Sequence, residues 1–339
     1  MENILITGGA GYIGSHVALE LLASQFNVFV IDNLSNSNTE AMKAIKILTN
    51  KEISFYEGDI CDQAFLNNFF KKNNIDCVVH CAGLKAVAES ISKPFEYYQN
   101  NLNGTLNLIS SMNKYSVKKI IFSSSATVYD SNQKMPLNEL SRIGKGQNPY
   151  ARTKIIIENL LQDLFSSDLK WSVTLLRYFN PVGNDPSSLI GEDPLGIPNN
   201  LMPLINQAAF NLSQLIIFGS DYETPDGTAI RDFIHVSDLA KGHMLSLKQI
   251  LDSDHKLKIY NLGLGKGVSV LEIINTFEKV NNLKLNYKFG NRREGDLPIC
   301  FTDNSYARKE LSWEPKFNLQ DMCKHSYQWY QQKISKDKS

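Results

Sequence analysis

The chain has 339 residues, more than one hydrophobic core usually holds, so we expect either one large domain or two unequal lobes. Hydrophobic residues make up 42% and charged residues 21% of the chain, which excludes a disordered or fibrous protein. Lys plus Arg and Asp plus Glu both number 35, so no net charge attracts nucleic acid or an anionic membrane. We therefore expect neither partner, and any anionic ligand must be held by local charges.

The start of the chain and its cysteines bear on the compartment. A glycine loop begins at Gly8, which leaves no room before it for a secretory signal peptide. No run approaches the roughly 18 uninterrupted apolar residues of a membrane helix. The five cysteines lack paired CxxC spacing and the six histidines show no metal spacing, so we predict neither disulfides nor a metal site. We expect a cytoplasmic protein.

Short β-branched runs alternate with longer helical patterns through the first half of the chain. The predicted strands are 4–6, 28–31, 53–55, 78–80, 120–122 and 173–177. The predicted helices carry apolar residues at three- and four-residue spacing and are 12–24, 62–73, 95–114 and 150–166. This alternation is typical of βαβ units, so we predict an α/β fold with a Rossmann-like, doubly wound parallel sheet.

Three glycines, Gly8, Gly11 and Gly14, follow the first predicted strand and open the first predicted helix. Glycines there allow a tight turn and close backbone approach, while the helix N-terminus presents N–H groups and a positive dipole end to a pyrophosphate. Asp32 ends the second predicted strand, where a carboxylate can bind the adenosine ribose hydroxyls and would repel the 2′-phosphate of NADP. The pattern predicts an NAD site.

After residue 180 the rhythm breaks into a Gly/Pro/Asp/Asn-rich stretch, 183–200, which indicates a domain boundary or a ligand-contacting loop. We predict that residues 1–180 form the NAD-binding domain, with a segment returning to it at about 232–262. Residues 181–339 are then a smaller C-terminal α/β lobe that binds the substrate.

A tyrosine and a lysine four residues apart share a helix face, and both Tyr150/Lys154 and Tyr115/Lys119 have this spacing. Position favours the first pair, because it follows the fifth strand, whose C-terminal end carries Ser123, Ser124 and Ser125, and ligands of open α/β sheets bind at strand C-termini. An adjacent ammonium stabilises a phenolate, so we expect Lys154 to lower the pKa of Tyr150. Such a trio suits alcohol–ketone hydride chemistry beside NAD.

With these residues in place, the chain resembles the extended short-chain dehydrogenase/reductase family, and within it the enzymes that invert C4 of UDP-hexoses. The resembling segments are 7–16, 82–87, 123–129, 177–183, 196–203, 226–228, 231–232 and 292–298. The resemblance runs nearly end to end and implies an isomerase of galactose metabolism that interconverts UDP-glucose and UDP-galactose. It also implies a homodimer formed through two helices per subunit.

The resemblance assigns roles to the catalytic residues. Tyr150 takes the proton of the sugar 4-hydroxyl while hydride passes from C4 to tightly held NAD, and the resulting 4-keto sugar turns over and receives hydride on its other face. Lys154 holds the nicotinamide ribose and tunes Tyr150, and Ser125 bonds the 4-oxygen.

The resemblance also implies two sets of binding residues. Cofactor contacts are Gly8, Gly11, Tyr12, Ile13, Gly14, Asp32, Asn33, Asp59, Ile60, Ala82, Lys85, Asn100, Tyr150, Lys154 and Phe179. Substrate contacts are Ser125, Tyr150, Asn180, Asn200, Leu201, Arg231, Arg293, Asp296 and Cys300. Guanidinium groups suit a diphosphate, and amides or a carboxylate suit uridine.

One position bears on the range of substrates. Two residues after Pro298 the family has either a bulky tyrosine or a small residue beside the sugar 2-substituent, and this chain has Cys300. A small side chain leaves room for a 2-acetamido group, so we predict that UDP-GlcNAc and UDP-GalNAc are also substrates. The alternative is a cysteine that only packs.

Other functions remain open at this point, since one fold hosts many reactions. Nucleotide-sugar 4,6-dehydratases carry an Asp-Glu pair where this chain has Val128 and Tyr129, which counts against dehydration. A 4-epimerase of another UDP-sugar, such as a xylose or uronic acid form, is an alternative. So is a non-catalytic NAD-sensing protein of the same fold.

Overall fold

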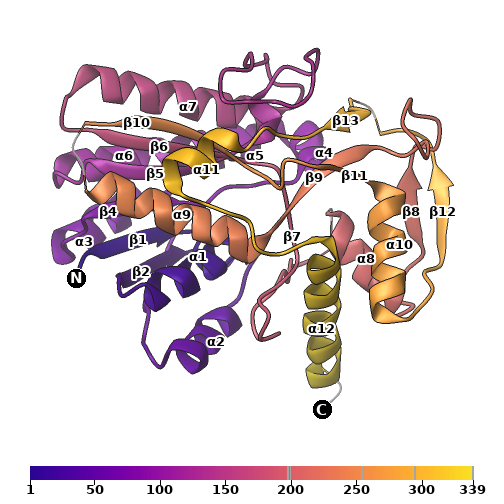
Figure 1. The fold of residues 1–339 in the computed structure, drawn as a ribbon. Coiled ribbons are helices and arrows are strands. Elements are labelled where there is room, and N and C mark those ends of the chain that lie inside the picture. Colours follow the sequence, from indigo (N-terminus) through magenta and orange to yellow (C-terminus); the bar gives the residue numbers. More distant parts are fainter. Residues whose placement is uncertain (197, 199, 253–254, 294, 338–339) are drawn as a thin grey trace. The chain divides into compact units, whose positions relative to one another are not determined.

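The computed structural model describes residues 1–196, 198, 200–252, 255–293 and 295–337 (Figure 1). The chain forms two compact units. Unit 1 comprises Met1–Asp130, Ser141–Tyr178 and Ala240–Tyr260, and unit 2 comprises Ser131–Leu140, Phe179–Leu239 and Asn261–Ser339. None of the helices in the described ranges combines the length and the apolar character that a membrane crossing requires.

Unit 1 is built on a seven-stranded sheet. Its strands are β1 (Asn3–Thr7), β2 (Asn27–Asp32), β3 (Ser54–Glu57), β4 (Cys77–His80), β5 (Lys119–Ser125), β6 (Ser172–Tyr178) and β10 (Leu257–Leu262). They lie in the order β10-β6-β5-β4-β1-β2-β3, and β1 to β6 pair in parallel. The strand order reverses beside β1, and ligands of such sheets bind at the strand carboxyl ends at this point. The predicted fold class is confirmed.

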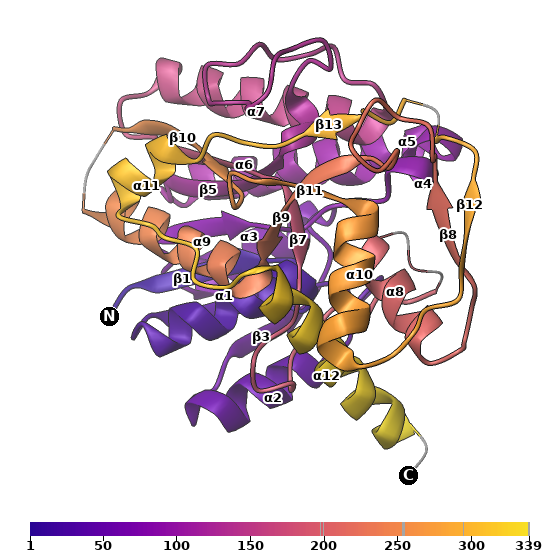
Figure 2. The ribbon, with the colours of Figure 1, turned by 45° about the vertical axis from the view of Figure 1, so that its right-hand side comes forward.

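The helices of unit 1 cover both faces of the sheet. They are α1 (Tyr12–Ala23), α2 (Glu40–Thr49), α3 (Gln63–Lys72), α4 (Val87–Ser92), α5 (Pro94–Tyr98), α6 (Gly104–Lys114), α7 (Pro149–Ser167) and α9 (Val236–Leu251), which enters from unit 2. Figures 1 and 2 show α6 and α7 on one side of the sheet and α1 and α9 on the other. The apolar sides of α3, α6 and α7 pack with the strands into one core.

All four predicted helices of this half are present. The predicted helix 95–114 is interrupted by a π-helical turn, Gln99–Asn103, between α5 and α6. Helix α2 was not predicted, and only Ala44 and Ile45 of its ten residues are buried, so its apolar stripe is short.

Unit 2 is a smaller α/β assembly. Its strands are β7 (Asn180–Val182), β8 (Leu215–Phe218), β9 (Ile230–His235), β11 (Gly267–Ser269), β12 (Tyr287–Gly290) and β13 (Ile299–Cys300). Strands β11, β9, β13 and β7 form one sheet, and β12 and β8 another. The helices are α8 (Leu201–Ala209), α10 (Val270–Asn281), α11 (Ser305–Leu311) and α12 (Leu319–Asp337). One core cluster joins α8, α10 and α12 to β8 and β9.

Residues 131–140 lie in unit 2, although they were predicted within the first domain. Leu137 donates its N–H to the carbonyl of Phe301 (3.0 Å) and accepts from the N–H of Asp303 (2.8 Å). The Glu139 carboxylate accepts from the N–H of Asn261 (2.7 Å). These partners are more than 120 residues away along the chain, so no local pattern marks this segment as part of unit 2.

Candidate active site

Two glycines of the loop between β1 and α1 are required by the packing of the chain itself. Gly8 has φ +70°, and a Cβ there would lie 2.7 Å from the backbone of Ala82. A Cβ on Gly14 would lie 2.2 Å from the carbonyl oxygen of Gly8. Both distances are far below van der Waals contact, so any larger residue must displace backbone.

Gly11 differs from its neighbours. A Cβ there would meet only the carbonyl oxygen of Gly8, at 3.4 Å, so the fold itself leaves room for a side chain. Gly11 is also the N-cap of α1 and provides no side-chain cap. Open space in front of a helix N-terminus, with its positive dipole end, fits the diphosphate of a dinucleotide.

We expect alanine at Gly14 to reduce stability and alanine at Gly11 to reduce NAD binding. Gly14→Ala should lower the free energy of unfolding by about 1–3 kcal/mol through overpacking. Gly11→Ala should change it by less than about 0.5 kcal/mol and weaken NAD binding. Denaturant unfolding and a fluorescence titration with NAD measure the two effects; a Gly11→Ala protein that binds NAD normally would contradict this assignment.

The second strand ends in a carboxylate held in one orientation. Asp32 is 8% exposed and accepts hydrogen bonds from the N–H of Ala10 (3.0 Å), the N–H of Leu34 (2.9 Å) and the Ser37 hydroxyl (2.9 Å). A carboxylate has about four acceptor positions, so capacity remains for a ribose hydroxyl.

The next predicted contacts lie beyond β2 and β3. The amide of Asn33 donates to Asp59 (3.0 Å), and the other oxygen of that carboxylate accepts from the N–H of Cys61 (2.7 Å). Ile60 is buried at 6% exposure. This arrangement places an amide, a carboxylate and an apolar side chain beyond the carboxyl ends of β2 and β3, in the part of the sheet that holds Asp32.

The remaining predicted cofactor residues fall in both units. In unit 1, Ile13 lies in the first turn of α1, the ammonium of Lys85 is 5.9 Å from the ring centre of Tyr12, and Asn100 lies in the π-helical turn. Phe179 belongs to unit 2, where its N–H bonds the carbonyl of Leu262 (3.0 Å).

The start of helix α7 is fixed by its capping residues, and it places Tyr150 and Lys154 on the same helix. Asn148 caps it by accepting from the N–H of Ala151 (2.9 Å), and Pro149 occupies the first helical position, both preferred at helix starts. Tyr150 and Lys154 therefore follow on one helix face, and both are buried.

Ser125, the last residue of β5, meets this face. Its hydroxyl lies close enough to the Tyr150 phenol to lower the pKa of that phenol, and it accepts from the N–H and hydroxyl of Thr127 (3.2 and 3.0 Å). Ser125 of β5 and the Tyr150/Lys154 pair of α7 thus lie together in unit 1, at the carboxyl end of β5.

The side chain of Lys154 is held by a hydrogen bond to the main chain of β5. Its ammonium donates to the carbonyl of Ser123 (2.7 Å) and lies 4.6 Å from the ring centre of Phe122 and 5.8 Å from that of Tyr150. Burial lowers the pKa of Lys154 to about 8, so the group is mostly charged at neutral pH and loses its charge above that value.

The expected lowering of the Tyr150 pKa is wrong for this chain. Burial raises the pKa of Tyr150, and only the hydrogen bond to Ser125 lowers it. The reason is geometric, since the Lys154 ammonium bonds the Ser123 carbonyl rather than the phenol oxygen.

The competing pair, Tyr115/Lys119, does not share a helix face. Tyr115 ends α6 and stacks on Phe70, with ring centres 6.3 Å apart, whereas Lys119 begins β5. The choice of Tyr150 and Lys154 over this pair therefore agrees with the structure.

A group of residues around Ser123 had not been assigned a role from sequence. The Ser123 hydroxyl contacts the Cys81 thiol (3.2 Å) and the His243 ring (2.9 Å), while its carbonyl holds Lys154. Cys81 thus lies beside Lys154. No local signal points to His243, which is 120 residues from Ser123.

Three predicted substrate residues come together in unit 2. Arg231 on β9 forms an ion pair with Asp296 and lies in register with Cys300 on β13. The neighbouring Asp232 is fully buried and accepts from the N–H groups of Leu264 (2.7 Å), Gly265 (3.0 Å) and Thr302 (3.1 Å). These bonds hold the segment that follows Cys300 against β9.

The other predicted substrate residues are also placed in unit 2. The guanidinium of Arg293 lies 4.2 Å from the ring centre of Phe218. Asn200 precedes α8 and donates to Glu192 (2.7 Å) rather than capping the helix, and Leu201 is the first residue of α8. Asn180 begins β7 and is exposed.

Buried residues occupy the two positions at which nucleotide-sugar 4,6-dehydratases carry their Asp-Glu pair. Val128 is fully buried and Tyr129 is 7% exposed, and the Tyr129 hydroxyl accepts a hydrogen bond from Arg177 (3.2 Å). Neither side chain supplies the carboxyl acid or base that water elimination requires. Among the described residues, no group of His, Cys, Asp or Glu is arranged to hold a metal ion.

Comparison with known proteins gives consistent results. Residues 4–263 match the family described as NAD dependent epimerase/dehydratase family. The chain is 51% identical to a UDP-glucose 4-epimerase of Bacillus subtilis, over 99% of both chains.

Two solved structures are similar over nearly the whole chain. That of UDP-glucose 4-epimerase from Bifidobacterium longum, in complex with NAD+ and UDP, has a TM-score of 0.95 at 45% identity and covers 98% of this chain and 99% of that one. That of the UDP-Glc/GlcNAc 4-epimerase of Campylobacter jejuni has a TM-score of 0.84 at 34% identity and covers 98% and 100%. The chain belongs to the NAD dependent epimerase/dehydratase family.

Proposed function

We propose that this protein inverts the configuration at C4 of UDP-glucose and UDP-galactose, using bound NAD. The observation that carries the proposal is the meeting of Ser125, Tyr150 and Lys154 at the carboxyl end of β5, two strands from the glycine loop. The near full-length similarity to UDP-glucose 4-epimerases supports the same reaction.

The residues of unit 1 suit NAD as the resident cofactor. The open N-terminus of α1 beside Gly11 would receive the diphosphate, and Asp32 would accept from the adenosine ribose hydroxyls. Lys154 would hold the nicotinamide ribose. When bound, NAD would supply the hydride acceptor and donor for sugar C4, so the reaction would involve no net oxidation.

The side chains of the chain supply the proton chemistry. Tyr150 removes the proton of the 4-hydroxyl as hydride leaves C4, and returns a proton after the 4-keto sugar has presented its other face. Ser125, which lies beside the phenol, bonds the 4-oxygen and fixes its position. The ammonium of Lys154 bonds the Ser123 carbonyl, so the Ser125 hydroxyl is the group that favours the phenolate form of Tyr150.

The residues of unit 2 suit a nucleotide sugar. Arg231 and Arg293 supply guanidinium groups for the diphosphate, and Asp296 a carboxylate for the ribose. Asn180, Asn200 and the start of α8 at Leu201 add amide and backbone donors.

Proton NMR of the purified protein with UDP-galactose tests the proposal. We expect conversion to UDP-glucose without added NAD, because the cofactor is recycled. UDP-xylose and a UDP-uronic acid, run in parallel, would reveal a 4-epimerase of another sugar. Failure to convert any of them after NAD is supplied would defeat the proposed reaction.

We further propose a homodimer, supported by exposed apolar side chains of unit 1. Ile91 on α4 is 61% exposed, Phe95 on α5 74% and Ile156 on α7 44%, and α4 and α5 both pack against α7. Apolar groups gathered on one face mark a protein interface.

Phe95→Glu should convert the dimer to a monomer, because a carboxylate cannot be buried unpaired in an apolar interface. Light scattering during gel filtration measures the mass. Ile47→Glu is the matched control, since Ile47 on α2 is 73% exposed and lies outside this face. A dimer that survives Phe95→Glu, or a monomeric wild type, would refute the interface.

We place the protein in a reducing compartment, the cytoplasm. All five cysteines are free thiols, which is usual where glutathione and thioredoxin keep thiols reduced.

A further inference from the structure

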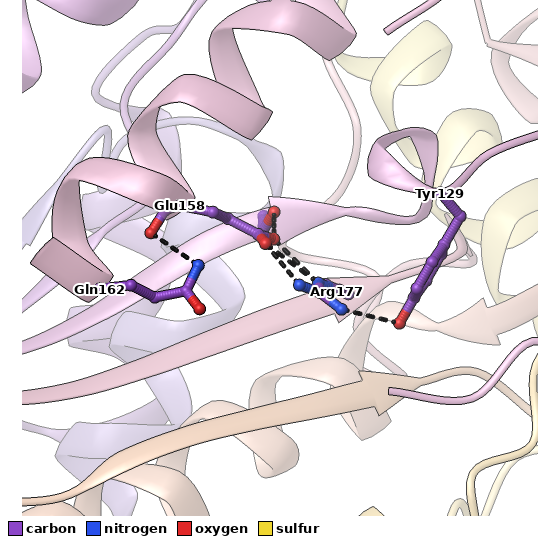
Figure 3. A network of polar contacts seen from close by, with 5 residues as sticks. Tyr129, Glu158, Gln162 and Arg177 are labelled. Carbon is purple, nitrogen blue, oxygen red and sulfur yellow. Dashed lines mark hydrogen bonds and ion pairs between the residues drawn. The ribbon is translucent and has the colours of Figure 1, made fainter. Parts of the chain in front are cut away.

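A buried polar network in unit 1 joins the elements that carry the catalytic residues (Figure 3). Glu158 of α7 forms an ion pair with Arg177 of β6, with Oε2 2.6 Å from Nη2 and Oε1 3.0 Å from Nε. The same carboxylate accepts from the Ser124 hydroxyl (2.5 Å), and Arg177 also donates to the Tyr129 hydroxyl (3.2 Å). The two charged side chains are 2% and 3% exposed.

A buried ion pair of this kind adds little to the stability of the fold, so stability alone does not explain its presence. Removing two charges from water costs about as much as their attraction returns, and apolar residues of similar volume often stabilise a core as well. What the network does achieve is a set of fixed relations between α7, β5 and β6.

The network reaches the catalytic groups on two sides. Ser124, which bonds Glu158, immediately precedes Ser125 and lies in register with Arg177 on the neighbouring strand. Glu158 follows Lys154 by one helical turn, so the two side chains share a face of α7.

The groups around Lys154 have opposite effects on its pKa. Burial lowers the pKa of Lys154, while Cys81 and, after it, the negative charge of Glu158 raise it. Burial raises the pKa of the Cys81 thiol to about 11, so this group is uncharged at neutral pH. His80 of β4 is neutral, because burial lowers its pKa to about 3. From β5, the Ser123 carbonyl accepts a hydrogen bond from the ammonium, and the uncharged Phe122 ring lies 4.6 Å from it.

Two further groups complete these surroundings. Tyr150 on α7 is protonated at neutral pH, since burial raises its pKa. Arg177 on β6 is the one cation of the network, and it is paired with Glu158. The carboxylate of Glu158 is therefore the fixed negative charge near Lys154 on these elements.

We propose that Glu158 is a positioning residue for the reaction, one that holds β5 and α7 in register at Ser125. The same carboxylate favours the charged form of Lys154. This rests on the proposed epimerase function. Arg177 is its counter-ion, without which the carboxylate would be buried unpaired.

Glu158→Gln tests the electrostatic role, because the amide keeps the shape and loses the charge. We expect kcat to fall about 100-fold, as for a small displacement of reacting groups, with KM for UDP-galactose within about twofold of wild type. Without the negative charge, and with Arg177 unpaired, the pKa of Lys154 falls, so the alkaline limb of kcat/KM should move about one pH unit lower.

Ser124→Ala tests the tether while leaving the ion pair in place. We expect kcat to fall about tenfold, the effect of losing a hydrogen bond to a charged acceptor, without movement of the alkaline limb. Gln162→Ala is the control. Its amide bonds the main-chain oxygen of Glu158 (3.1 Å) and not the carboxylate, so both kcat and the pH profile should stay unchanged.

Circular dichroism and NAD binding accompany each assay. If Glu158→Gln does not fold, Ser124→Ala decides, and a wild-type kcat in that variant overturns the proposal. A folded, NAD-binding Glu158→Gln with a wild-type kcat and pH profile also overturns it, as does an equal loss in Gln162→Ala. A wild-type protein that epimerises no UDP-sugar refutes the proposed function and this inference with it, whereas active variants beside an active wild type refute this inference alone.

Discussion

Replacing Tyr150 by phenylalanine should lower kcat by about 10²–10⁴, the usual contribution of a general acid–base group. The phenol is the group at this site that can exchange a proton with the sugar 4-oxygen, since Ser125 lacks a sufficiently basic oxygen and Lys154 bonds the Ser123 carbonyl. Single-turnover and steady-state assays with UDP-galactose measure the loss.

The fold and the cofactor site should survive this change. Phenylalanine fills the same buried volume, and Ser125 keeps its bonds to Thr127 (3.0 and 3.2 Å), so we expect the free energy of unfolding to change by less than about 1 kcal/mol. Tyr115→Phe is the matched control and should leave kcat unchanged. A Tyr150→Phe protein with more than a tenth of wild-type kcat would contradict the role of Tyr150, whereas a wild type that binds NAD without turnover would point to a protein that senses NAD without catalysis.

Replacing Cys300 by tyrosine should suppress turnover of the N-acetylated pair, UDP-GlcNAc and UDP-GalNAc, by about 100-fold in kcat/KM. Cys300 is half-buried on β13 beside Arg231 and within five residues of Asp296, two of the proposed nucleotide-sugar contacts. A tyrosine there would fill the space that a 2-acetamido group needs, whereas a 2-hydroxyl needs far less.

The measurement is the ratio of kcat/KM for UDP-GalNAc to that for UDP-galactose. Cys300→Ala keeps the position small and should preserve the wild-type ratio. If wild type converts UDP-galactose alone, or if Cys300→Tyr leaves the ratio unchanged, Cys300 only packs. Its thiol has no chemical role in this prediction, because burial raises its pKa to about 11 and keeps it protonated.

Local sequence patterns predict much of the candidate site. The spacing of Gly8, Gly11 and Gly14 and the position of Asp32 depend on a strand, a turn and a helix that are contiguous in the chain. The Tyr150/Lys154 pair depends on one helix, and a cap at Asn148 sets its start. The resemblance of long segments supplied the residues of unit 2, whose roles remain predictions.

The sequence by itself determined the alternation of strands and helices, the fold class and the dinucleotide loop, because each rests on contacts between near neighbours or on a regular period. The tertiary structure alone decided what distant segments do to one another: that residues 131–140 join unit 2, that His243 and Cys81 meet at Ser123, and that Glu158 pairs with Arg177. It also reversed the expected direction of the Tyr150 pKa, since burial and the direction of the Lys154 ammonium are properties of packing and not of spacing.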